Sequence, residues 1–569
     1  MPDSTVGRDE HARASPIRGD APMFYAVIAG VAFGIYLLTL TNNFTDGEDA
    51  LRYVRNITIG EDVWRFGNHL IFNFAGMGWF GLWRAMGYAD NALLPMQVLS
   101  AASAAISVGL TAWVGRRIGL SAGLAVSAAV GMAVSSCFWA YGVLPDTYAV
   151  PIPFVLFGFV CLLRALREEH CSGGAPAPWV LAATLSWSIA TILHQQNVLF
   201  FGPGALMLVW ESASRRAGLR WAALLLGLGC ALTLGSYILV AVYGVGLRSV
   251  PDFVRWTMGY AKDGPWTPWS WMSLPKGLVG LLRSVFAINL AFGVDAVAQV
   301  AQRAVPNMLL VEERYFAEYL RPATLYAALA GLAASALVAL ALVAILARRW
   351  FSTSPHVTER IGGQRRIALW LGLMAASQAI PVIAWEPINP EFWVATLPWF
   401  WLLIAWSIHR NGDRRARGLW WAFIALLGLT NAMGYVFPQT DPDSDYWRQA
   451  NALPLRLLNP GDQMITTGGY VSDGYLGLQS RRLVISGVYG IGEVHRRVVA
   501  TPTQSRLVVS SWLADPPAFL VGNSQLDLWD RAEAQRLLSC YRPNLELLGQ
   551  SADQTVWELR RPVPNCAGA

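Results

Sequence analysis

Long apolar stretches alternate with short polar segments over the first three quarters of the chain. Eleven of these stretches approach the length of about 20 residues that an α-helix needs to cross a bilayer. They lie at residues 23–41, 92–114, 118–140, 149–166, 178–193, 197–211, 221–243, 323–347, 367–384, 393–408 and 418–436. The pattern predicts an α-helical polytopic membrane protein with about eleven transmembrane helices.

Two further apolar stretches are ambiguous, and the basic residues help to interpret them. Lys and Arg in short loops stay on the cytoplasmic side of a membrane. If the N-terminus is cytoplasmic, that side receives the basic clusters at 116–117, 164–167, 215–216, 348–349 and 410–417. A span at 69–84 would reverse this agreement, so we expect a juxtamembrane or re-entrant helix there. The stretch 277–301 is either an interfacial helix or a pair of short spans, and the pair would raise the total to thirteen.

The composition supports a membrane location. Of 569 residues, 54% are hydrophobic and 14% are charged, and the mean hydropathy of +0.38 is too high for a soluble protein of this size. The net charge of +6 does not indicate a nucleic-acid partner, because the basic residues form short clusters between apolar stretches. Residues 1–22 lack the pattern of a signal peptide and are expected to form a flexible cytoplasmic tail.

Residues 439–569 differ in character from the predicted transmembrane domain at 23–438 and favour a small α/β domain. Runs typical of strands occur at residues 463–467, 482–486, 517–521 and 543–548, and a helix is expected at 525–540. This domain follows an odd number of spans and is therefore expected to be extracytoplasmic. Cys540 and Cys566 both lie in it, and an oxidising compartment would permit a disulfide.

The predicted topology places most of the chemically interesting side chains on the outer side. The outer segments are the loops 42–91 and 244–322, "GVLPDTY" at 142–148, "LHQQN" at 193–197 and "WEPINPEFW" at 385–393. An ionisable group at membrane depth is costly unless it lines water or has a partner. We therefore expect a polar cavity that opens to the outer side.

The segment "TDGED" places Asp46, Glu48 and Asp49 directly after the first apolar stretch. These acids could simply mark the end of a span, since acids are free to lie in outer loops. If a helix continues through them, Asp46 and Asp49 share one face, and Glu48 is spaced for an i,i+4 pair with Arg52. The unpaired carboxylate could then be a general base of raised proton affinity, or two carboxylates could bind a divalent cation.

Other outer residues have both a structural and a functional interpretation. His69 fits an interfacial helix cap as well as a binding site, and His194 and Gln195 lie where two spans meet, where a packing histidine is the more common outcome. Glu391 is followed closely by Trp393, and an acid among indoles at a membrane surface suits a sugar ring. A belt of interfacial aromatic residues explains the same tryptophans.

The order of these features resembles the GT-C superfamily of membrane glycosyltransferases, in particular its bacterial protein-mannosyltransferase-like and aminoarabinose-transferase-like branch. In that family an outer loop with one or two acids follows the first span, and juxtamembrane helices cover the site; here "TDGED" and "NHLIFN" take these positions. "CFWAYGVLPDTYAVP" at 137–151 resembles an aromatic-rich region of the family, with Asp146 where Glu is usual. The D-x-D form of some members is replaced by D-x-E at Asp46 and Glu48.

The resemblance implies transfer of a sugar from a polyprenyl-phosphate donor, with inversion at the anomeric carbon. The acceptor would be an envelope lipid, glycan or protein at the outer face of the inner (cytoplasmic) membrane. Asp46 would be the general base, and Asp49 or Glu48 would orient it or bind a divalent cation, Mg²⁺ or Mn²⁺. The D-x-E form leaves the use of a metal open.

The resemblance also implies roles in substrate binding. Lys262, Arg255 or His194 would stabilise the leaving phosphate electrostatically. Glu391 and Trp393 would contact the sugar or the acceptor. The remaining predicted substrate-binding residues are His69, Asp146, Tyr148 and Gln195.

Two other functions remain open from the sequence. A transporter or flippase for a lipid-linked glycan would also use outer acids and a central cavity, but it should show matched broken spans in two halves of the chain, and these are not evident. A polysaccharide polymerase or ligase of another membrane fold would rely on cationic and histidine-bearing outer loops. Acids directly after the first span favour the sugar transferase over both.

Overall fold

The computed structural model describes residues 22–45, 47, 49–64, 67–171, 176–263, 269–304, 311–352, 362–411, 413–518 and 529–566. Residues 1–21 of the predicted tail therefore lie outside the described part of the chain. The same is true of Asp46 and Glu48, and of the Lys262 side chain.

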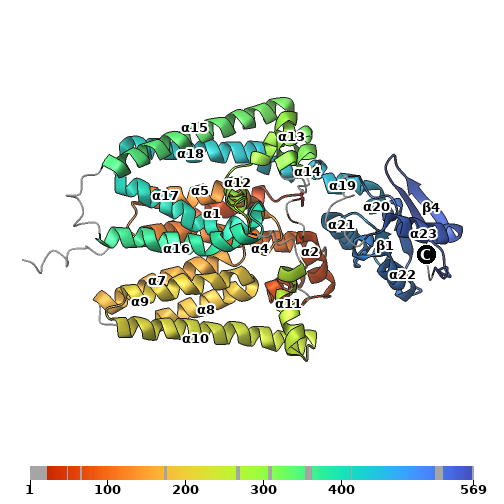
Figure 1. Cartoon of the computed structure of the whole chain (residues 1–569), viewed down its shortest axis with the longest axis horizontal. Helices are drawn as coiled ribbons and strands as arrows, with labels where there is room; N and C mark the ends of the chain where they lie inside the picture. Colours follow the sequence, from red (N-terminus) through yellow and green to blue (C-terminus); the bar gives the residue numbers. More distant parts are fainter. Residues whose placement is uncertain are drawn as a thin grey trace, which may run out of the picture.

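Long helices run side by side through the part of the chain that precedes residue 440 (Figure 1). They are α1 (Pro22–Leu38), α4 (Leu93–Arg117), α5 (Ala122–Val134), α6 (Ser136–Val143), α7 (Ile152–Cys171), α8 (Ala177–Leu193), α9 (Phe201–Glu211), α10 (Arg215–Leu239), α15 (Pro322–Ser352), α16 (Gly362–Trp385), α17 (Leu397–Asn411) and α18 (Arg414–Asn431). Each predicted span falls on one of these helices, and α5 and α6 share the third. Glycines let large rings fill the bundle: the Trp187 indole lies against Gly158 and Gly204, where a Cβ would overlap it.

The apolar helices confirm a multi-pass membrane protein, while the number of spans stays a prediction. Within the described residues, six helices are long and apolar enough to cross a membrane, or seven if α5 and α6, bent by 66°, form one broken span. The helices α1 and α8 are apolar but shorter. The predicted totals of eleven and thirteen spans therefore depend on helices below the usual length.

Shorter helices fill the segments expected on the outer side. They are α2 (Ala50–Ile59), α3 (Phe72–Ala85), α11 (Val250–Asp263), α12 (Ser273–Val285), α13 (Asp295–Ala304) and α14 (Val311–Tyr319). The helix expected at 69–84 is α3, and its 14 residues are too few for a perpendicular crossing. The ambiguous stretch 277–301 contains two helices, α12 and α13, with a 3₁₀ turn between them at Ile288–Gly293.

The C-terminal region forms a five-stranded sheet with helices packed on it. The strands are β1 (Gln463–Thr466), β2 (Ile485–Ser486), β3 (Leu507–Ser510), β4 (Leu545–Gln550) and β5 (Thr555–Leu559), in the order β2-β1-β3-β5-β4. The pairs β1–β2 and β1–β3 are parallel, and β5 is antiparallel to both β3 and β4. The helices are α19 (Tyr446–Ala450), α20 (Ala452–Leu457), α21 (Tyr470–Ser480), α22 (Ile491–Ala500) and α23 (Arg531–Tyr541).

Several details of this region differ from the sequence expectation. Strands at 463–467 and 543–548 are found, and the run at 482–486 contributes only the two residues of β2. Residues 519–528, which include most of the expected strand at 517–521 and the start of the expected helix at 525–540, lie outside the described residues. The strands β3 and β5 were not predicted, and Cys540 and Cys566 form a disulfide.

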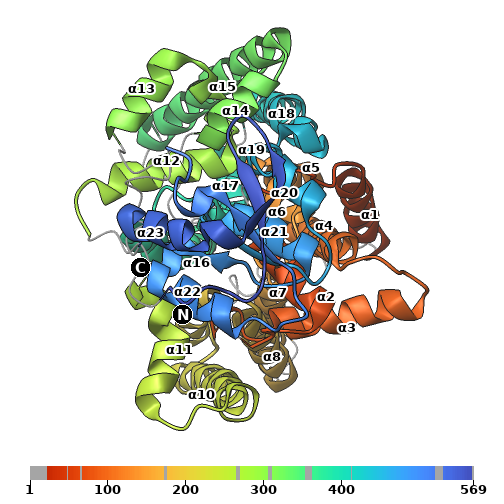
Figure 2. The same ribbon diagram turned by 90° about the vertical axis from the view of Figure 1, so that its right-hand side faces the viewer.

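The C-terminal region is attached to the loop that follows α1. Figure 2 shows its helices and strands in front of the helix ends of the bundle. The carboxylate of Asp445 accepts hydrogen bonds from the Phe44 N–H at 2.7 Å, the Arg448 N–H at 3.0 Å and the Tyr475 hydroxyl at 2.7 Å. The Asn43 amide donates to the Ser444 carbonyl at 2.9 Å. The loop that leads into the acid cluster is therefore held by residues 401 positions away in the sequence.

Candidate active site

The helix α2 presents Asp49 and Arg52 near the C-terminal region. Its apolar residues, Leu51 and Val54 among them, are buried on one face, and Gly60 ends it in the left-handed conformation at φ 73°. Asp49 immediately precedes the helix, and its carboxylate lies 3.3 Å from Nη1 of Arg52. The Asp49 carboxylate is 37% exposed, so it is accessible to a substrate.

A continuous helix through the acid cluster, one of the two cases considered for it, is not supported by the described residues. The helix α1 ends at Leu38, Gly47 is not helical and α2 begins at Ala50, while Asp46 lies outside the described residues. Arg52 pairs with Asp49 at i,i+3, while its expected partner Glu48 lies outside the described residues. The physical reason is local: Asn and Asp compete for backbone hydrogen bonds and favour loops and caps.

Asp146 lies in the buried loop between α6 and α7. Its carboxylate accepts a hydrogen bond from the Thr147 N–H, and the residue is 3% exposed. Burial raises the pKa of Asp146 to about 7, the Thr147 hydrogen bond lowers it, and the charge of Asp49 raises it further. Asp146 is thus a carboxyl group that can hold or release a proton near neutral pH.

Two histidines and two tyrosines pack against one another at this loop, with their rings edge-to-face or tilted. The ring centroids of His69 and His194 are 4.7 Å apart, those of Tyr148 and His194 are 4.9 Å apart, and those of Tyr141 and Tyr148 are 5.1 Å apart. Burial lowers the pKa of His194 to about 4 and that of His69 well below its usual range. Both imidazoles are therefore neutral at pH 7 and supply no positive charge.

Glu391 approaches the same cluster from the turn before α17. Oε2 of its carboxylate accepts a hydrogen bond from the Tyr141 hydroxyl at 3.1 Å, and Oε1 accepts one from the Asn389 amide at 2.8 Å. Trp393, two residues on, is only 2% exposed, and its indole N–H donates to the Pro387 carbonyl. Glu391 is therefore the residue of this turn that presents a carboxylate to the cluster, whereas Trp393 packs in the interior.

The carboxylates of these separate segments all act on Tyr53 of α2 through their charge. Burial raises the pKa of the Tyr53 hydroxyl well above its usual range, and the charges of Asp49, Asp146 and Glu391 raise it further. The Tyr53 ring also packs against His69, with centroids 5.9 Å apart. The structure therefore gathers Asp49, His69, Asp146, Tyr148, His194 and Glu391, all predicted from the sequence, into one cluster.

Other predicted residues stand apart from this cluster. The Arg255 side chain is 74% exposed and pairs with Asp252 on its own helix. Gln195 is half-buried in the 3₁₀ turn at Gln195–Phe200, and its neighbour Gln196 donates to the Phe392 carbonyl at 3.3 Å. Among the described residues, no three His, Cys, Asp or Glu side chains are grouped so as to hold a metal ion.

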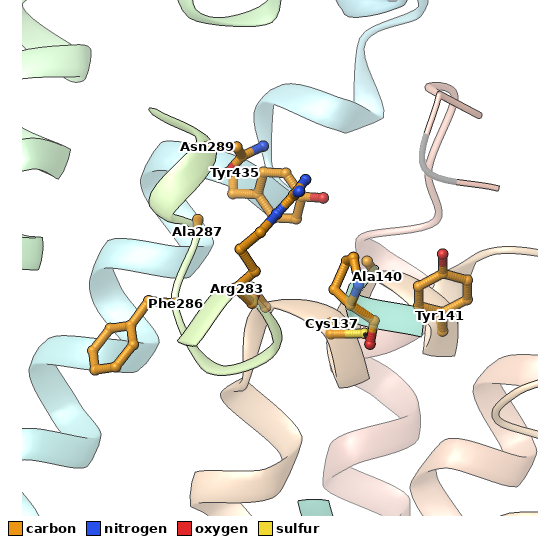
Figure 3. A pocket seen from close by; sticks show the side chains of 10 residues that line it. Cys137, Ala140, Tyr141, Arg283, Phe286, Ala287, Asn289 and Tyr435 are labelled. Carbon is orange, nitrogen blue, oxygen red and sulfur yellow. Dashed lines mark hydrogen bonds between the residues drawn. The ribbon is translucent and has the colours of Figure 1, made fainter. Parts of the chain in front are cut away.

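A pocket beside Glu391 contains an arginine that the sequence analysis did not single out. It has about 340 Å³ of empty space, open solvent included, and its lining includes Tyr141, Arg283, Asn289 and Tyr435. Figure 3 shows the Arg283 side chain extending from α12 toward Asn289 and Tyr435. Arg283 is 14% exposed, and its Nη2 lies 2.6 Å from the Glu313 carboxylate. The only sequence signal was a single arginine inside the apolar stretch 277–301.

Glu386, a second acid of the segment "WEPINPEFW", was not predicted as a site residue from the sequence. Burial raises the pKa of Glu386 to about 7. The signal would have been its place directly after α16, where an apolar helix of 24 residues ends in an acid. Glu386 is therefore a second carboxyl group with a raised proton affinity in the segment that carries Glu391.

Comparisons with known proteins show the fold. No protein-family model matches the sequence, and no curated protein matches it significantly. Among solved structures, ArnT from Cupriavidus metallidurans bound to undecaprenyl phosphate aligns over 95% of this chain and 99% of its own, with a TM-score of 0.54 and 12% identity. The Archaeoglobus fulgidus oligosaccharyltransferase in complex with Zn and sulfate aligns over 90% of this chain and 71% of its own, with a TM-score of 0.47 and 12% identity.

Proposed function

We propose that this chain, whose fold is that of the GT-C membrane glycosyltransferase ArnT, transfers a sugar from a polyprenyl-phosphate donor to an envelope lipid, glycan or protein. The observation that carries the proposal is the placement of carboxylates from three distant segments around Tyr53, within a fold shared over 95% of the chain. Fold alone does not define an activity. The site's chemistry supplies the second argument.

The reaction requires a base for the acceptor and positive charge for the leaving group. The acceptor hydroxyl oxygen attacks the anomeric carbon, and its proton passes to a carboxylate. The bond between that carbon and the phosphate oxygen breaks, and its electron pair leaves on the phosphate. Attack from the face opposite the phosphate inverts the configuration. Asp46 is proposed as the base, as the sequence predicts, and Asp49, which pairs with Arg52, would orient it.

Arg283 is proposed to stabilise the leaving phosphate, on a comparison limited to the side chains that the structure describes, which leaves out Lys262. It is largely buried, lines the pocket beside Tyr141, and retains donors besides the Nη2 that faces Glu313. A guanidinium at low dielectric stabilises a developing phosphate charge strongly. His194 is neutral and Arg255 is exposed on a helix surface, so Arg283 replaces them in the proposal.

A divalent cation would further neutralise the donor phosphate. The candidate ligands Asp46 and Glu48 lie outside the described residues, and the described side chains include no group of three that fits a metal. Asp46 and Glu48 are the residues that would hold such a cation. The proposal also includes the location of the chain. It lies in the inner membrane, with the N-terminus cytoplasmic and the C-terminal domain on the extracytoplasmic side.

The test uses the purified full chain in lipid nanodiscs with a panel of polyprenyl-monophosphate sugars. Release of polyprenyl phosphate is followed with and without a crude envelope extract as acceptor. We expect release by wild type and a loss of at least tenfold in Asp49→Asn and Arg283→Gln. No release from any donor, even with extract, would refute the proposal.

The Arg283 variant needs a structural control, because removing one partner of a buried ion pair leaves an uncompensated charge. The double variant Arg283→Gln/Glu313→Gln removes both charges and should recover thermal stability. If release recovers as well, Arg283 acts only through the fold. Arg255→Gln should retain wild-type release, since this exposed arginine is paired with Asp252.

A further inference from the structure

A second pocket lies between α2 and the C-terminal region. It has about 460 Å³ of empty space, open solvent included. Its charged lining is unusual: four arginines and a single carboxylate. These residues are Arg52, Arg55, Arg482, Arg497 and Asp473. In Figure 1, α2 and α21 lie side by side where the bundle meets the C-terminal region.

Arg55 of α2 is a buried residue in the lining of this pocket. Its side chain is 3% exposed, and its Nε is buried without a hydrogen-bond partner within the described structure. Nη1 donates to the Asn56 side chain at 2.8 Å, and Nη2 donates to the exposed Glu61 carboxylate at 3.3 Å. A buried guanidinium N–H left without an acceptor costs free energy, and a bound anion would remove that cost.

The acids that pair with these arginines do not fill the pocket. Asp49 holds Arg52 and Glu493 holds Arg497, and neither acid is a lining residue. Arg482 has no ion pair among the described residues. Asp473 is the lining carboxylate, and burial raises its pKa to about 7, with the charge of Arg52 acting in the opposite direction. The four arginines therefore outnumber the negative charges of the pocket lining whether or not Asp473 is ionised.

Two glycines of α21 make room for this pocket lining. A Cβ at Gly477 would lie 3.4 Å from Cδ of Arg55 and 3.0 Å from the Arg482 carbonyl oxygen. A Cβ at Gly474 would lie 3.1 Å from Cβ of Leu51. The contacts at 3.0 and 3.1 Å are tighter than ordinary packing, so glycine at these positions lets α21 approach α2 and the Arg482 backbone closely.

We propose that this pocket binds a phosphate group of the acceptor. Arginine forks match phosphate oxygens bidentately, and four guanidinium groups from two regions of the chain suit a multiply charged group better than a single carboxylate. Arg52 lines the pocket and also pairs with Asp49. The Arg52 side chain would therefore connect an acceptor bound in this pocket with the carboxylate cluster. The role as an acceptor site rests on the proposed function, whereas phosphate binding does not.

The test measures binding of inorganic pyrophosphate to the full chain in phosphatidylcholine nanodiscs by calorimetry. Arg482→Gln and Arg497→Gln are expected to weaken binding about tenfold or more each. The matched control is Arg496→Gln: Arg496 also pairs with Glu493, is 78% exposed and does not line the pocket. Absence of binding to wild type, or equal binding by all three variants, would overturn the proposal.

The source of the phosphate is separated in a second arm. Phosphatidic acid in the nanodiscs should lower the apparent pyrophosphate affinity of wild type and Arg496→Gln if a lipid phosphate reaches the pocket. Unchanged affinity assigns the pocket to a soluble phosphate. Donor cleavage in the same preparations keeps the two proposals distinct. Cleavage without pyrophosphate binding defeats only the pocket. Binding without cleavage defeats the transferase and with it the acceptor role of the pocket, but not phosphate binding.

Discussion

Removing the Asp445 carboxylate should release the loop that leads into the acid cluster. Asp445 is fully buried, and its two oxygens accept three hydrogen bonds, from the Phe44 N–H, the Arg448 N–H and the Tyr475 hydroxyl. The Arg448 bond is also the N-cap of α19. One side chain thus holds the loop after α1, the start of α19 and the helix α21 together.

The magnitude follows from these three bonds. An N-cap is worth about 0.5–2 kcal/mol, and a buried donor left without an acceptor costs about 1–3 kcal/mol. Asp445→Ala should therefore cost roughly 3–6 kcal/mol, allowing for partial relaxation. In Asp445→Asn the amide oxygen can keep the Phe44 and Tyr475 bonds, both of which reach Oδ2. That variant should lose only the cap, about 1 kcal/mol.

The assay is hydrogen exchange of the full chain in nanodiscs, read from peptides that cover residues 41–45. About 1.4 kcal/mol corresponds to a tenfold change in the opening equilibrium. Asp445→Ala should speed exchange at Phe44 by a hundredfold or more, and Asp445→Asn should change it little. Asp443→Ala is the control, because Asp443 is exposed and its side chain accepts from Gln449. If Asp445→Ala and Asp443→Ala exchange alike, the loop is not held by this carboxylate.

Three further results are expected. Burial raises the pKa of Asp146 from 3.8 to about 7. Its contribution to stability is therefore complete below pH 4 and is lost as the pH rises through 7. Asp146→Asn should unfold at the same temperature as wild type at pH 4 and at a higher temperature at pH 8, where its free energy of unfolding should be larger by up to about 4 kcal/mol. Gly280→Ala places a Cβ onto the Pro387 carbonyl and should reduce the free energy of unfolding by about 1–3 kcal/mol, seen as a lower melting temperature. Gly202→Ala, with open space around it, should leave the melting temperature unchanged. Cys540→Ser opens a loop of 26 residues and should destabilise the C-terminal region by about 3.5 kcal/mol, seen as an earlier unfolding transition.

The membrane helices could be predicted from the sequence because their signal is local. An apolar stretch of sufficient length must satisfy its own backbone in lipid, and a helix is the only single-segment solution. Strands depend on their partners instead. Leu507–Ser510 is a run of only four residues, and as β3 it pairs with β1 on one side and β5 on the other. The short run does not reveal these partners.

The candidate site was predictable where it depends on residue type and sidedness. Asp146, His194 and Glu391 stand out because polar groups at the ends of apolar stretches need a reason. Arg283 does not stand out, because its partner Glu313 is 30 residues away on another helix. The pocket that Arg52 and Arg482 line could not be predicted from the sequence either, since no spacing rule connects α2 with a region more than 400 residues later.

The attachments of the acid loop explain why these two parts of the chain must be considered together. Neither Asn43 nor Phe44 is held by the helix α1 that precedes them; their hydrogen bonds lead to Ser444 and Asp445. A loop held mainly through its tertiary contacts is only as ordered as the structure that it contacts. The C-terminal region therefore helps to hold the loop that precedes Asp49, and we expect a change in how it docks on α2 to alter the geometry of the carboxylate cluster without altering any of its residues.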